Sequence, residues 1–430
     1  MNPYLQYMYS YPHKTAYRSL SGISLGDYAL ILKGRGHGLY LHLPFCRTKC
    51  GYCNLFSVTG QNEEQIDRYL CAVERQSRQY QTVLRTVQTS FSELVIGGGT
   101  PLLLTAAQLL RTFRMLEEHF VWDRDRALVI ETSPGETTGE KLAVLKEAGV
   151  TRLSMGIQSL WDEELRTLRR QHSGKQALEA LSLIREYGFS CVNVDFIYGI
   201  PGQTVDSLLT SLGQALAFEP EEIFLYPLYV KHGVRLLREG VAADPESALL
   251  QYREAGAYLR AMGFRQDSMR RFVRDACPRE YLECGFGTSL ALGCGGRSYL
   301  GNLHFCSPYA VTREGCLAQI QAFEETKDYT KITHGMILEE EEERRRYVIR
   351  HLLIRPGLFL PGYQEHFGTS ALDDFPILKR WEQEAYVCRE GVYLTLTEVG
   401  LERSDWLGPM LISEGVREKM EEWERIHEGT

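Results

Sequence analysis

This 430-residue sequence lacks several features that mark particular protein classes. No apolar run approaches the roughly 18 residues that a membrane-spanning helix needs, and residues 1–19, which are rich in Tyr, contain no hydrophobic signal core. Positive charge is in the minority, with 48 Lys and Arg against 56 Asp and Glu, whereas nucleic-acid binding depends on clustered positive charge. We therefore expect a cytoplasmic protein that binds neither a membrane nor nucleic acid.

Two nucleotide-binding patterns are also missing. The sequence has neither a G-x-G-x-x-G fingerprint nor a P-loop lysine, so neither NAD nor ATP is indicated. Internal repeats and low-complexity linkers are absent as well, and the 44% hydrophobic and 24% charged residues are ordinary for a globular protein. What is unusual is an odd number of cysteines, 11 in all. In a reducing cytoplasm we expect them to remain thiols.

A regular alternation of short apolar runs and longer amphipathic stretches extends from Gly38 to about Val230. The predicted strands are Leu39–Leu43, Leu94–Ile96, Ala127–Ile130, Arg152–Ile157, Cys191–Ile197 and Ile223–Leu228. The predicted helices are Asn62–Tyr80, Thr105–Phe120, Thr137–Ala148, Gly174–Tyr187 and Thr204–Ala217. Such alternation predicts an α/β fold with a parallel sheet. Because six units are fewer than the eight of a closed barrel, we expect an incomplete, TIM-like (β/α)6 barrel.

We divide the chain into four parts on this basis. Residues 1–37 are expected to cover the substrate or cofactor, and residues 38–230 to form the partial barrel. Residues 231–335 are expected to extend the barrel with a helix near Pro245–Met262 and substrate-side loops. Residues 336–430 are expected to form a small, mostly helical or winged domain, with a helix from the charged run Glu339–Arg346 and a strand at Gly391–Leu396. We expect the protein to be a monomer.

Polar residues follow every predicted strand of the barrel, at the end where parallel α/β barrels carry their chemistry. In chain order these are Cys46, Cys50 and Cys53; Gly97, Gly98, Gly99 and Thr100; Glu131; Gln158; Asp195; and Tyr226 to Tyr229. The glycine run follows a strand and precedes a helix, so it permits close approach of the backbone to a polar ligand. This placement predicts one functional site at the open end of the barrel.

The spacing of the three cysteines, C-x3-C-x2-C, favours an iron–sulfur cluster. Zinc prefers a tetrahedron built from two separated ligand pairs, and no second Cys or His pair lies nearby. His42 precedes Cys46 by four residues and is more typical of a packed, hydrogen-bonding residue than of a ligand. Three thiolates on a [4Fe–4S] cluster leave one iron open to an external ligand. Zinc and unligated thiols remain the alternatives.

A second set of residues matches an amino acid joined to a ribose. Glu131 and Asp195 supply acids for hydroxyl or ammonium groups, Gln158 supplies an amide, and Arg170 supplies a cation for a carboxylate. Individually each is more typical of a hydrogen-bonded barrel residue or a surface charge than of a ligand contact. Arg169 is the rival for the role of Arg170.

These motifs together resemble the radical S-adenosylmethionine enzymes. The motifs Tyr40-Leu-His-Leu-Pro-Phe-Cys46, Gly97-Gly-Gly-Thr-Pro101, Arg152 to Ser159, Arg170-Gln-His172 and Asn193 to Pro201 are similar to the oxygen-independent coproporphyrinogen III oxidase-like (HemN/HemW-like) group. Residues 38–300 carry this resemblance, and the C-terminal part resembles that group's last domain. The motifs Tyr9 to Arg18, Cys50 to Phe56 and Phe264 to Arg270 resemble a subgroup named after STM-type Salmonella proteins.

The resemblance implies a role for each motif. Cys46, Cys50 and Cys53, with Tyr52 before the last, would hold the cluster. The loop of Gly97, Gly98, Gly99 and Thr100 would grip the methionine part of S-adenosylmethionine together with Glu131; Arg170 would bind its carboxylate, and Gln158 and Asp195 its ribose. Tyr40 matches an aromatic residue beside the cluster where a second S-adenosylmethionine binds, and the loop Gly293 to Ser298 matches a second-site or substrate-side loop. A small-molecule substrate and a flavodoxin or ferredoxin as electron donor are also implied.

The sequence departs from the group at two positions. Leu55 stands where the dehydrogenases have a further cysteine, and Asn54 where the heme chaperones have Asp. The leading hypothesis is therefore an enzyme that uses a second S-adenosylmethionine to transfer a methyl or methylene group to an sp2 carbon. The alternatives are oxidative decarboxylation of the coproporphyrinogen III dehydrogenase type and a heme-binding chaperone, for which Cys277-Pro278 is the one candidate pair. The candidate cations for an anionic substrate are Arg18, Lys14, Arg270, Arg271 and Arg274.

Overall fold

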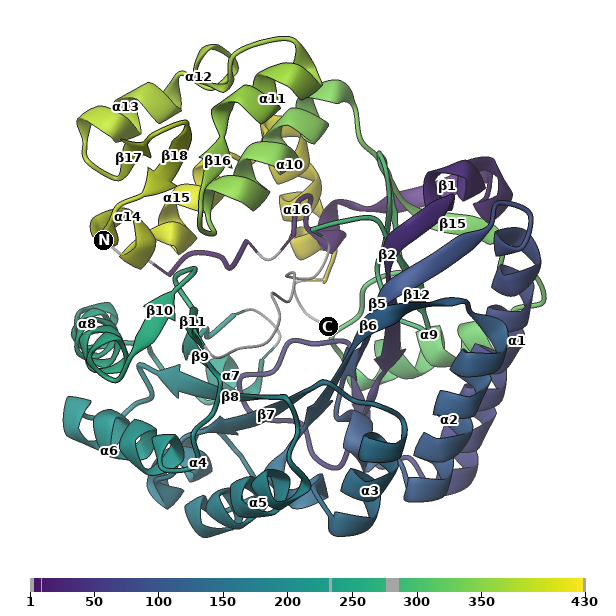
Figure 1. Ribbon diagram of the computed structural model, residues 1–430, viewed down its shortest axis with the longest axis horizontal. Helices are drawn as coiled ribbons and strands as arrows, with labels where there is room; N and C mark the ends of the chain where they lie inside the picture. The colour runs from purple at the N-terminus through teal and green to yellow at the C-terminus, as the bar shows by residue number, and fades with distance from the viewer. Residues whose placement is uncertain (1–3, 9, 232–233, 276–285, 428–430) are drawn as a thin grey trace.

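The computed structural model describes residues 4–8, 10–231, 234–275 and 286–427. A curved sheet with helices on its outer side forms the barrel, and a second, mostly helical part lies beside it, at the upper left of Figure 1. Cys277-Pro278 falls outside the described residues. Among the residues that are described, no helix combines the length and apolar composition needed to cross a membrane.

Six neighbouring parallel strands form the centre of the sheet, as the sequence predicts. They are β2 (Gly34–Leu43), β5 (Thr89–Gly98), β6 (Trp122–Thr132), β7 (Arg152–Gln158), β8 (Cys191–Tyr198) and β9 (Glu222–Pro227). The helices between them are α1 (Glu63–Leu84), α2 (Ala106–His119), α3 (Gly139–Glu147), α4 (Asp162–Thr167), α5 (Gly174–Tyr187) and α6 (Val205–Leu216). The prediction of an α/β fold with a parallel sheet is confirmed, and only the short α4 was not predicted.

Local capping explains where these helices begin. Asn62, Thr105, Ser173 and Thr204 each accept a hydrogen bond from the backbone N–H three residues on, and the side chain at that position returns the bond. Such reciprocal caps satisfy backbone donors that the first helical turn leaves unpaired. The apolar residues of each helix then pack against the outer face of the sheet. Leu39, Leu41 and Leu43 of β2 belong to this core.

Further strands extend the sheet at both edges, so that it contains 13 strands among the described residues. Beside β2 lie β12 (Ser289–Leu292), β13 (Ser298–Leu300), β14 (Leu303–Phe305), β15 (Lys331–Ile337) and β1 (Arg18–Ser24). Beyond β9 lie β11 (Arg271–Arg274) and β10 (Phe264–Gln266), which follow α7 (Arg235–Arg238) and α8 (Pro245–Ala261). Only β12 is parallel to its barrel neighbour. The sequence analysis predicted none of these strands.

The second part has its own core. Its helices are α10 (Glu340–Leu352), α11 (Leu360–Phe367), α12 (Ala371–Asp374), α13 (Ile377–Gln383), α14 (Glu398–Glu402), α15 (Ser404–Met410) and α16 (Glu414–His427). A three-stranded sheet of β16 (Leu358–Phe359), β18 (Tyr393–Leu396) and β17 (Val387–Glu390) completes it. Met8, Tyr11 and Ala16 are buried in this core rather than in the barrel. The N-terminal segment therefore runs between the two parts (Figure 1).

Candidate active site

A chamber of about 670 Å³ opens at the carboxyl ends of the barrel strands. Residues from five of the six central strands, β5 to β9, line it, together with the loop that follows β2, the N-terminal segment and Tyr309. Of the sequence-predicted site residues, the chamber brings together Cys46, Cys50, Tyr52, Cys53, Gly98, Gly99, Thr100, Glu131, Gln158, Arg170 and Asp195. Gly97 and Tyr40 lie outside its lining.

The three cysteines lie on the loop that follows β2. Cys46 ends the short strand β3 (Phe45–Cys46), which pairs with β4 (Val58–Thr59) and so closes the loop at its base. At the tip of the loop, the backbone of Gly51 donates to Leu168 and accepts from Leu236. All three thiols are partly exposed to the chamber. Burial raises the pKa of the Cys46 thiol to about 12, so binding of iron must displace its proton.

The donor set fits a cluster better than a single metal ion. Among the described residues, no three His, Cys, Asp or Glu side chains gather closely enough to coordinate one ion. A mononuclear zinc site needs such a group, whereas an iron–sulfur cluster binds its thiolates through different irons. Three cysteines around one chamber suit the latter arrangement.

His42 holds the cysteine loop from the barrel interior. Its Nε2 lies 3.0 Å from the carbonyl oxygen of Phe56, just after the loop, and its Nδ1 lies 3.0 Å from the hydroxyl of Tyr40. Burial lowers the pKa of His42 to about 4, so the ring is neutral and donates one of these bonds while accepting the other. His42 therefore forms hydrogen bonds within the protein, as the sequence analysis expected. Tyr40 hydrogen-bonds this histidine, which in turn bonds the residue just after the loop.

The glycines of the second loop are needed for close contact within the protein. A Cβ atom at Gly99 would lie 2.5 Å from the carbonyl oxygen of Phe45, and one at Gly98, where φ is +120°, would lie 2.7 Å from the His42 ring. The N–H groups of Gly98, Gly99 and Thr100 donate to Glu131, Leu43 and Phe45 respectively. The sequence analysis expected these glycines to let the backbone approach a ligand. With these amide donors used internally, the loop can offer a ligand its carbonyl oxygens and the hydroxyl of Thr100.

Two carboxylates face the chamber from neighbouring regions of the sheet. Enclosure by the surrounding protein raises the pKa of Glu131 to about 7, and the nearby charge of Asp195 adds to this effect. Burial likewise raises the pKa of Asp195 to about 6, against the effect of a 2.7 Å hydrogen bond from Asn193. Buried acids of this kind are stabilised by a cationic ligand. The ammonium and sulfonium groups of S-adenosylmethionine meet that requirement.

The choice between Arg169 and Arg170 is decided by geometry. Arg169 points outward and pairs with Glu239 at 3.0 Å. Arg170 lines the chamber, where it donates to Cys50 Sγ at 3.2 Å and to the carbonyl of Gly156. Its buried Nε has no hydrogen-bond partner among the described residues. Of the two arginines, Arg170 is therefore the one that lies in the chamber.

Gln158 lies beside Arg170 in a strained conformation. Its φ of +75° falls in the left-handed region, at the point where the pairing of β7 with β8 is interrupted. Strain of about 1 to 3 kcal/mol at such a position is typical of functional sites. The bulge turns the end of β7 toward the chamber.

Most of the candidate cations for an anionic substrate do not reach the chamber. Arg18 pairs with Glu422, and Arg271 with Glu222 and Asp267. Arg274 is likewise absent from the chamber lining. Only Lys14 lines it. For Arg18 and Arg271, the sequence does not reveal that these positive charges already have acidic partners.

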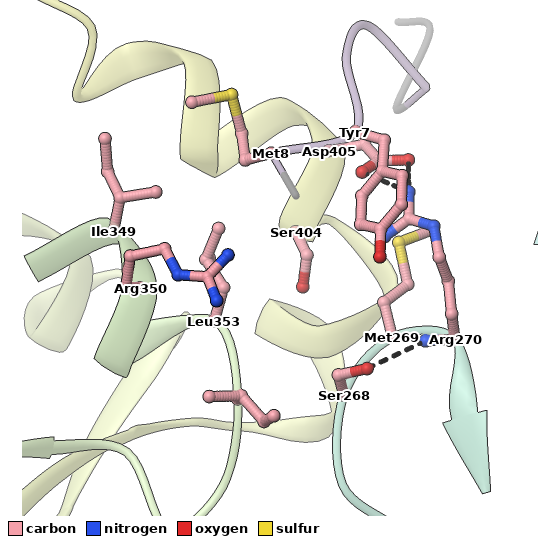
Figure 2. A pocket seen from close by; sticks show the side chains of 11 residues that line it. Tyr7, Met8, Ser268, Met269, Arg270, Ile349, Arg350, Leu353, Ser404 and Asp405 are labelled. Atoms are coloured by element: carbon pink, nitrogen blue, oxygen red, sulfur yellow. Dashed lines mark hydrogen bonds and ion pairs between the residues drawn. The ribbon is translucent and has the colours of Figure 1, made fainter. Parts of the chain in front are cut away.

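Arg270 forms a buried ion pair behind the chamber wall (Figure 2). Its Nη2 lies 2.5 Å from Asp405 Oδ1, and both side chains are at most 5% exposed. Tyr229, which lines the chamber, donates its hydroxyl proton to Asp405. The Arg270 guanidinium also stacks on Tyr7, with its carbon 3.7 Å from the ring centroid. Arg270 thus supports two tyrosines of the chamber instead of facing it.

Tyr309 is a chamber residue that the sequence analysis missed. Its hydroxyl donates to the carbonyl of Asn54 on the cysteine loop at 2.7 Å. No motif surrounds it in the sequence. The loop Gly293 to Ser298, by contrast, does not line the chamber. Its backbone donates to Gln76, Tyr69 and Ser307, which hold it behind β2.

Residues 40–214 match the family described as the Radical SAM superfamily. This match agrees with the fold and with the three-cysteine loop. Heme chaperone HemW of Mycobacterium tuberculosis (strain ATCC 25618 / H37Rv) is 33% identical over 311 residues, covering 68% of this chain and 78% of that protein. Oxygen-independent coproporphyrinogen III oxidase of Escherichia coli (strain K12) is 26% identical over 402 residues, covering 88% of this chain and 83% of that protein.

The solved structure of HemN, the coproporphyrinogen III oxidase from Escherichia coli, shares the fold with a TM-score of 0.81 at 22% identity, over 94% of this chain and 98% of that one. The chain belongs to the HemN/HemW-like group of radical S-adenosylmethionine proteins. Its cofactors are those of the family, a [4Fe–4S] cluster and S-adenosylmethionine, as expected from the sequence.

Proposed function

We propose that this enzyme transfers a methyl or methylene group from a second S-adenosylmethionine to an sp2 carbon of a small molecule. The observation that supports the proposal is the presence of leucine at position 55. This residue lines the chamber beside the cysteine loop, at the position where the related dehydrogenases have a further cysteine. An aliphatic side chain cannot supply that thiol. Asn54 likewise replaces the Asp of the chaperone branch.

Different residues of the chamber would bind different parts of the cofactors. Cys46, Cys50 and Cys53 would hold the cluster, which when bound supplies the electron that cleaves S-adenosylmethionine to methionine and a 5′-deoxyadenosyl radical. Arg170 would bind the carboxylate of the first S-adenosylmethionine, and Glu131 would accept hydrogen bonds from its ammonium group. The remaining residues of the chamber wall would keep water away from the 5′-deoxyadenosyl radical, so that the radical reacts only with its intended carbon.

The volume of the chamber supports a second molecule. At about 670 Å³ it lies in the upper half of the roughly 300 to 1,000 Å³ typical of ligand sites. Methylation of a carbon that carries hydrogen would consume two S-adenosylmethionine molecules and two electrons. It would yield methionine, 5′-deoxyadenosine, S-adenosylhomocysteine and the methylated product, with one methyl hydrogen passing to 5′-deoxyadenosine. A flavodoxin or ferredoxin would supply the electrons.

Product analysis tests the proposal. Under anaerobic conditions with dithionite, the reconstituted protein should release 5′-deoxyadenosine and S-adenosylhomocysteine together. Deoxyadenosine alone would contradict methyl transfer and favour an oxidative decarboxylation. The relatives named heme chaperone favour a third outcome, in which added heme binds at micromolar concentration and produces a Soret band without either product.

The cysteine assignment has its own test. Replacing Cys46, Cys50 and Cys53 together with alanine should abolish the brown colour and all cleavage of S-adenosylmethionine. Cys388→Ala is the matched control, because this free thiol lies in the second part of the molecule. A triple variant that keeps its iron would show that the cluster is bound elsewhere.

A further inference from the structure

The tip of the cysteine loop contacts a surface helix, α7. The backbone N–H of Leu236 donates to the carbonyl of Gly51 at 2.9 Å, and a Cβ atom at Gly51 would lie 3.0 Å from the Leu236 side chain. Glycine at this position therefore allows α7 to pack against the loop. Gly51 directly follows Cys50, one of the three proposed cluster ligands. Little more than one layer of residues thus separates the exposed side of α7 from the cluster site.

A small apolar core joins α7 to the loop. Tyr52, which follows Gly51, packs against this core. The core is separate from that of the barrel, and its buried members are Leu168, Ile197, Ile200, Leu228, Val234 and Leu236. Because these side chains are at most 5% exposed, buried apolar contacts hold α7 against the loop.

The outward face of α7 is positively charged around an exposed leucine. Arg235 and Arg238 flank Leu237, whose exposed fraction is 44%. Arg169 lies beside them, since Arg169 and Arg235 share one acidic partner, Glu239, at 3.0 and 2.7 Å. Among the described residues, Arg238 has no ion-pair partner. These five residues, which we call the α7 face, combine three arginines with one glutamate and so carry an excess of positive charge.

The end of the cysteine loop at Asn54, by contrast, is covered by other parts of the chain. Tyr309 donates to the carbonyl of Asn54 at 2.7 Å. The centroid of the Tyr309 ring in turn lies 3.7 Å from Lys14 Nζ and 5.1 Å from the centroid of the Trp423 ring. A protein partner that approached from this side would have to displace these contacts. The α7 face needs no such rearrangement, because it is already exposed.

We propose that the α7 face is the docking surface for a flavodoxin, an acidic protein that would supply electrons to the cluster. A flavodoxin exposes the apolar edge of its flavin within an acidic rim, and this arrangement is complementary to Leu237 among its arginines. In the complex one electron passes from the reduced flavodoxin to the cluster, and no bond forms or breaks. The inference rests on the proposed function only in placing the cluster on the three cysteines.

Titration calorimetry with oxidised flavodoxin at low ionic strength tests the docking surface. Arg238→Glu should weaken binding about tenfold, because it places a negative charge opposite the acidic rim. Glu239→Gln should strengthen binding about threefold, because it removes the acid of the α7 face. Arg114→Glu is the matched control. Arg114 is also exposed and has no ion-pair partner among the described residues, but it lies on α2 at the outer side of the barrel (Figure 1).

Stopped-flow absorbance of the cluster measures the electron transfer itself. At limiting concentrations of reduced flavodoxin, Arg238→Glu should slow reduction of the cluster about tenfold. Reduction by dithionite, a small molecule that needs no docking surface, should change less than about twofold. Leu237→Ser should weaken flavodoxin binding without changing its dependence on salt, because it removes an apolar contact and no charge.

The proposal is overturned if Arg114→Glu weakens binding as much as Arg238→Glu, or if Glu239→Gln weakens it. It is also overturned if Arg238→Glu slows both reductants equally, or if a ferredoxin of similar charge binds more tightly than flavodoxin. Neither measurement detects a product, so methyl transfer is judged separately by the formation of S-adenosylhomocysteine. A wrong cysteine assignment would be recognised from the triple alanine variant, before any flavodoxin is added.

Discussion

Replacing Asp405 with leucine should destabilise the protein by about 3 to 5 kcal/mol, because the change leaves the guanidinium of Arg270 buried without its counter-ion. The side chains of Arg270 and Asp405 are only 5% and 1% exposed, and their closest atoms are 2.5 Å apart. Little water can therefore compensate for the lost charge. The same substitution removes the acceptor for the hydroxyl of Tyr229. The loss is comparable to the whole stability of a marginal domain.

A double-mutant cycle separates the charge effect from the loss of packing. Arg270→Met/Asp405→Leu removes both charges, and we expect it to be at least about 2 kcal/mol more stable than Asp405→Leu alone. Arg253→Met is the matched surface control, because Arg253 also bridges to the second part of the molecule, at Glu402, but is 55% exposed. It should cost no more than about 1 kcal/mol.

Urea unfolding followed by circular dichroism measures these differences through the transition midpoint. The reasoning would be refuted if Asp405→Leu unfolds within about 1 kcal/mol of the unchanged protein, or if the effects of the two substitutions simply add. Either result would mean that the pair is hydrated or that Arg270 finds another acceptor.

Three further predictions concern the chamber. Since the pKa of Glu131 is raised to about 7, affinity for cationic S-adenosylmethionine should increase as the pH rises through about 7, and Glu131→Gln should abolish that increase in equilibrium dialysis. Arg170→Met should weaken the same binding by about tenfold or more, whereas the outward-pointing Arg169→Met should change it less than about twofold. Gly99→Ala should lower the thermal midpoint by several degrees, because its Cβ meets the backbone of Phe45, while Gly135→Ala, which lines the same chamber with open space around it, should have little effect.

Each of these three predictions has a result that would contradict it. A pH dependence that survives in Glu131→Gln would assign the titration to Asp195, whose pKa is raised to about 6. Equal losses in Arg169→Met and Arg170→Met would remove the distinction between the two side chains. A Gly99→Ala variant as stable as Gly135→Ala would show that the loop can move away from Phe45.

The central barrel and the cysteine loop were predictable because their signals are local. The periodicity of strands and helices, and the caps at residues such as Asn62 and Thr105, lie within a few positions of the elements they specify. The spacing of the three cysteines is local as well. A parallel barrel places the carboxyl ends of its strands at one face. The polar residues at the ends of several strands therefore lie around one chamber.

The features of the fold and the site that were not predicted depend on contacts between distant parts of the chain. Arg270 was a plausible substrate contact until its partner Asp405, 135 residues further on, was located. Tyr309 reaches Asn54 across 255 positions. Short edge strands such as β1 are specified by the strand they pair with, here β15, more than by their own composition. No pattern within one segment reports such partners.

The path of the N-terminal segment has a consequence for the order of events during synthesis. Met8, Tyr11 and Ala16 are buried in a core whose other members begin at residue 348, and Arg18 pairs with Glu422 on α16. At about 5 to 20 residues per second, residues 4–18 therefore wait on the order of 20 to 80 seconds for their packing partners. The chamber wall that carries Lys14 is completed last.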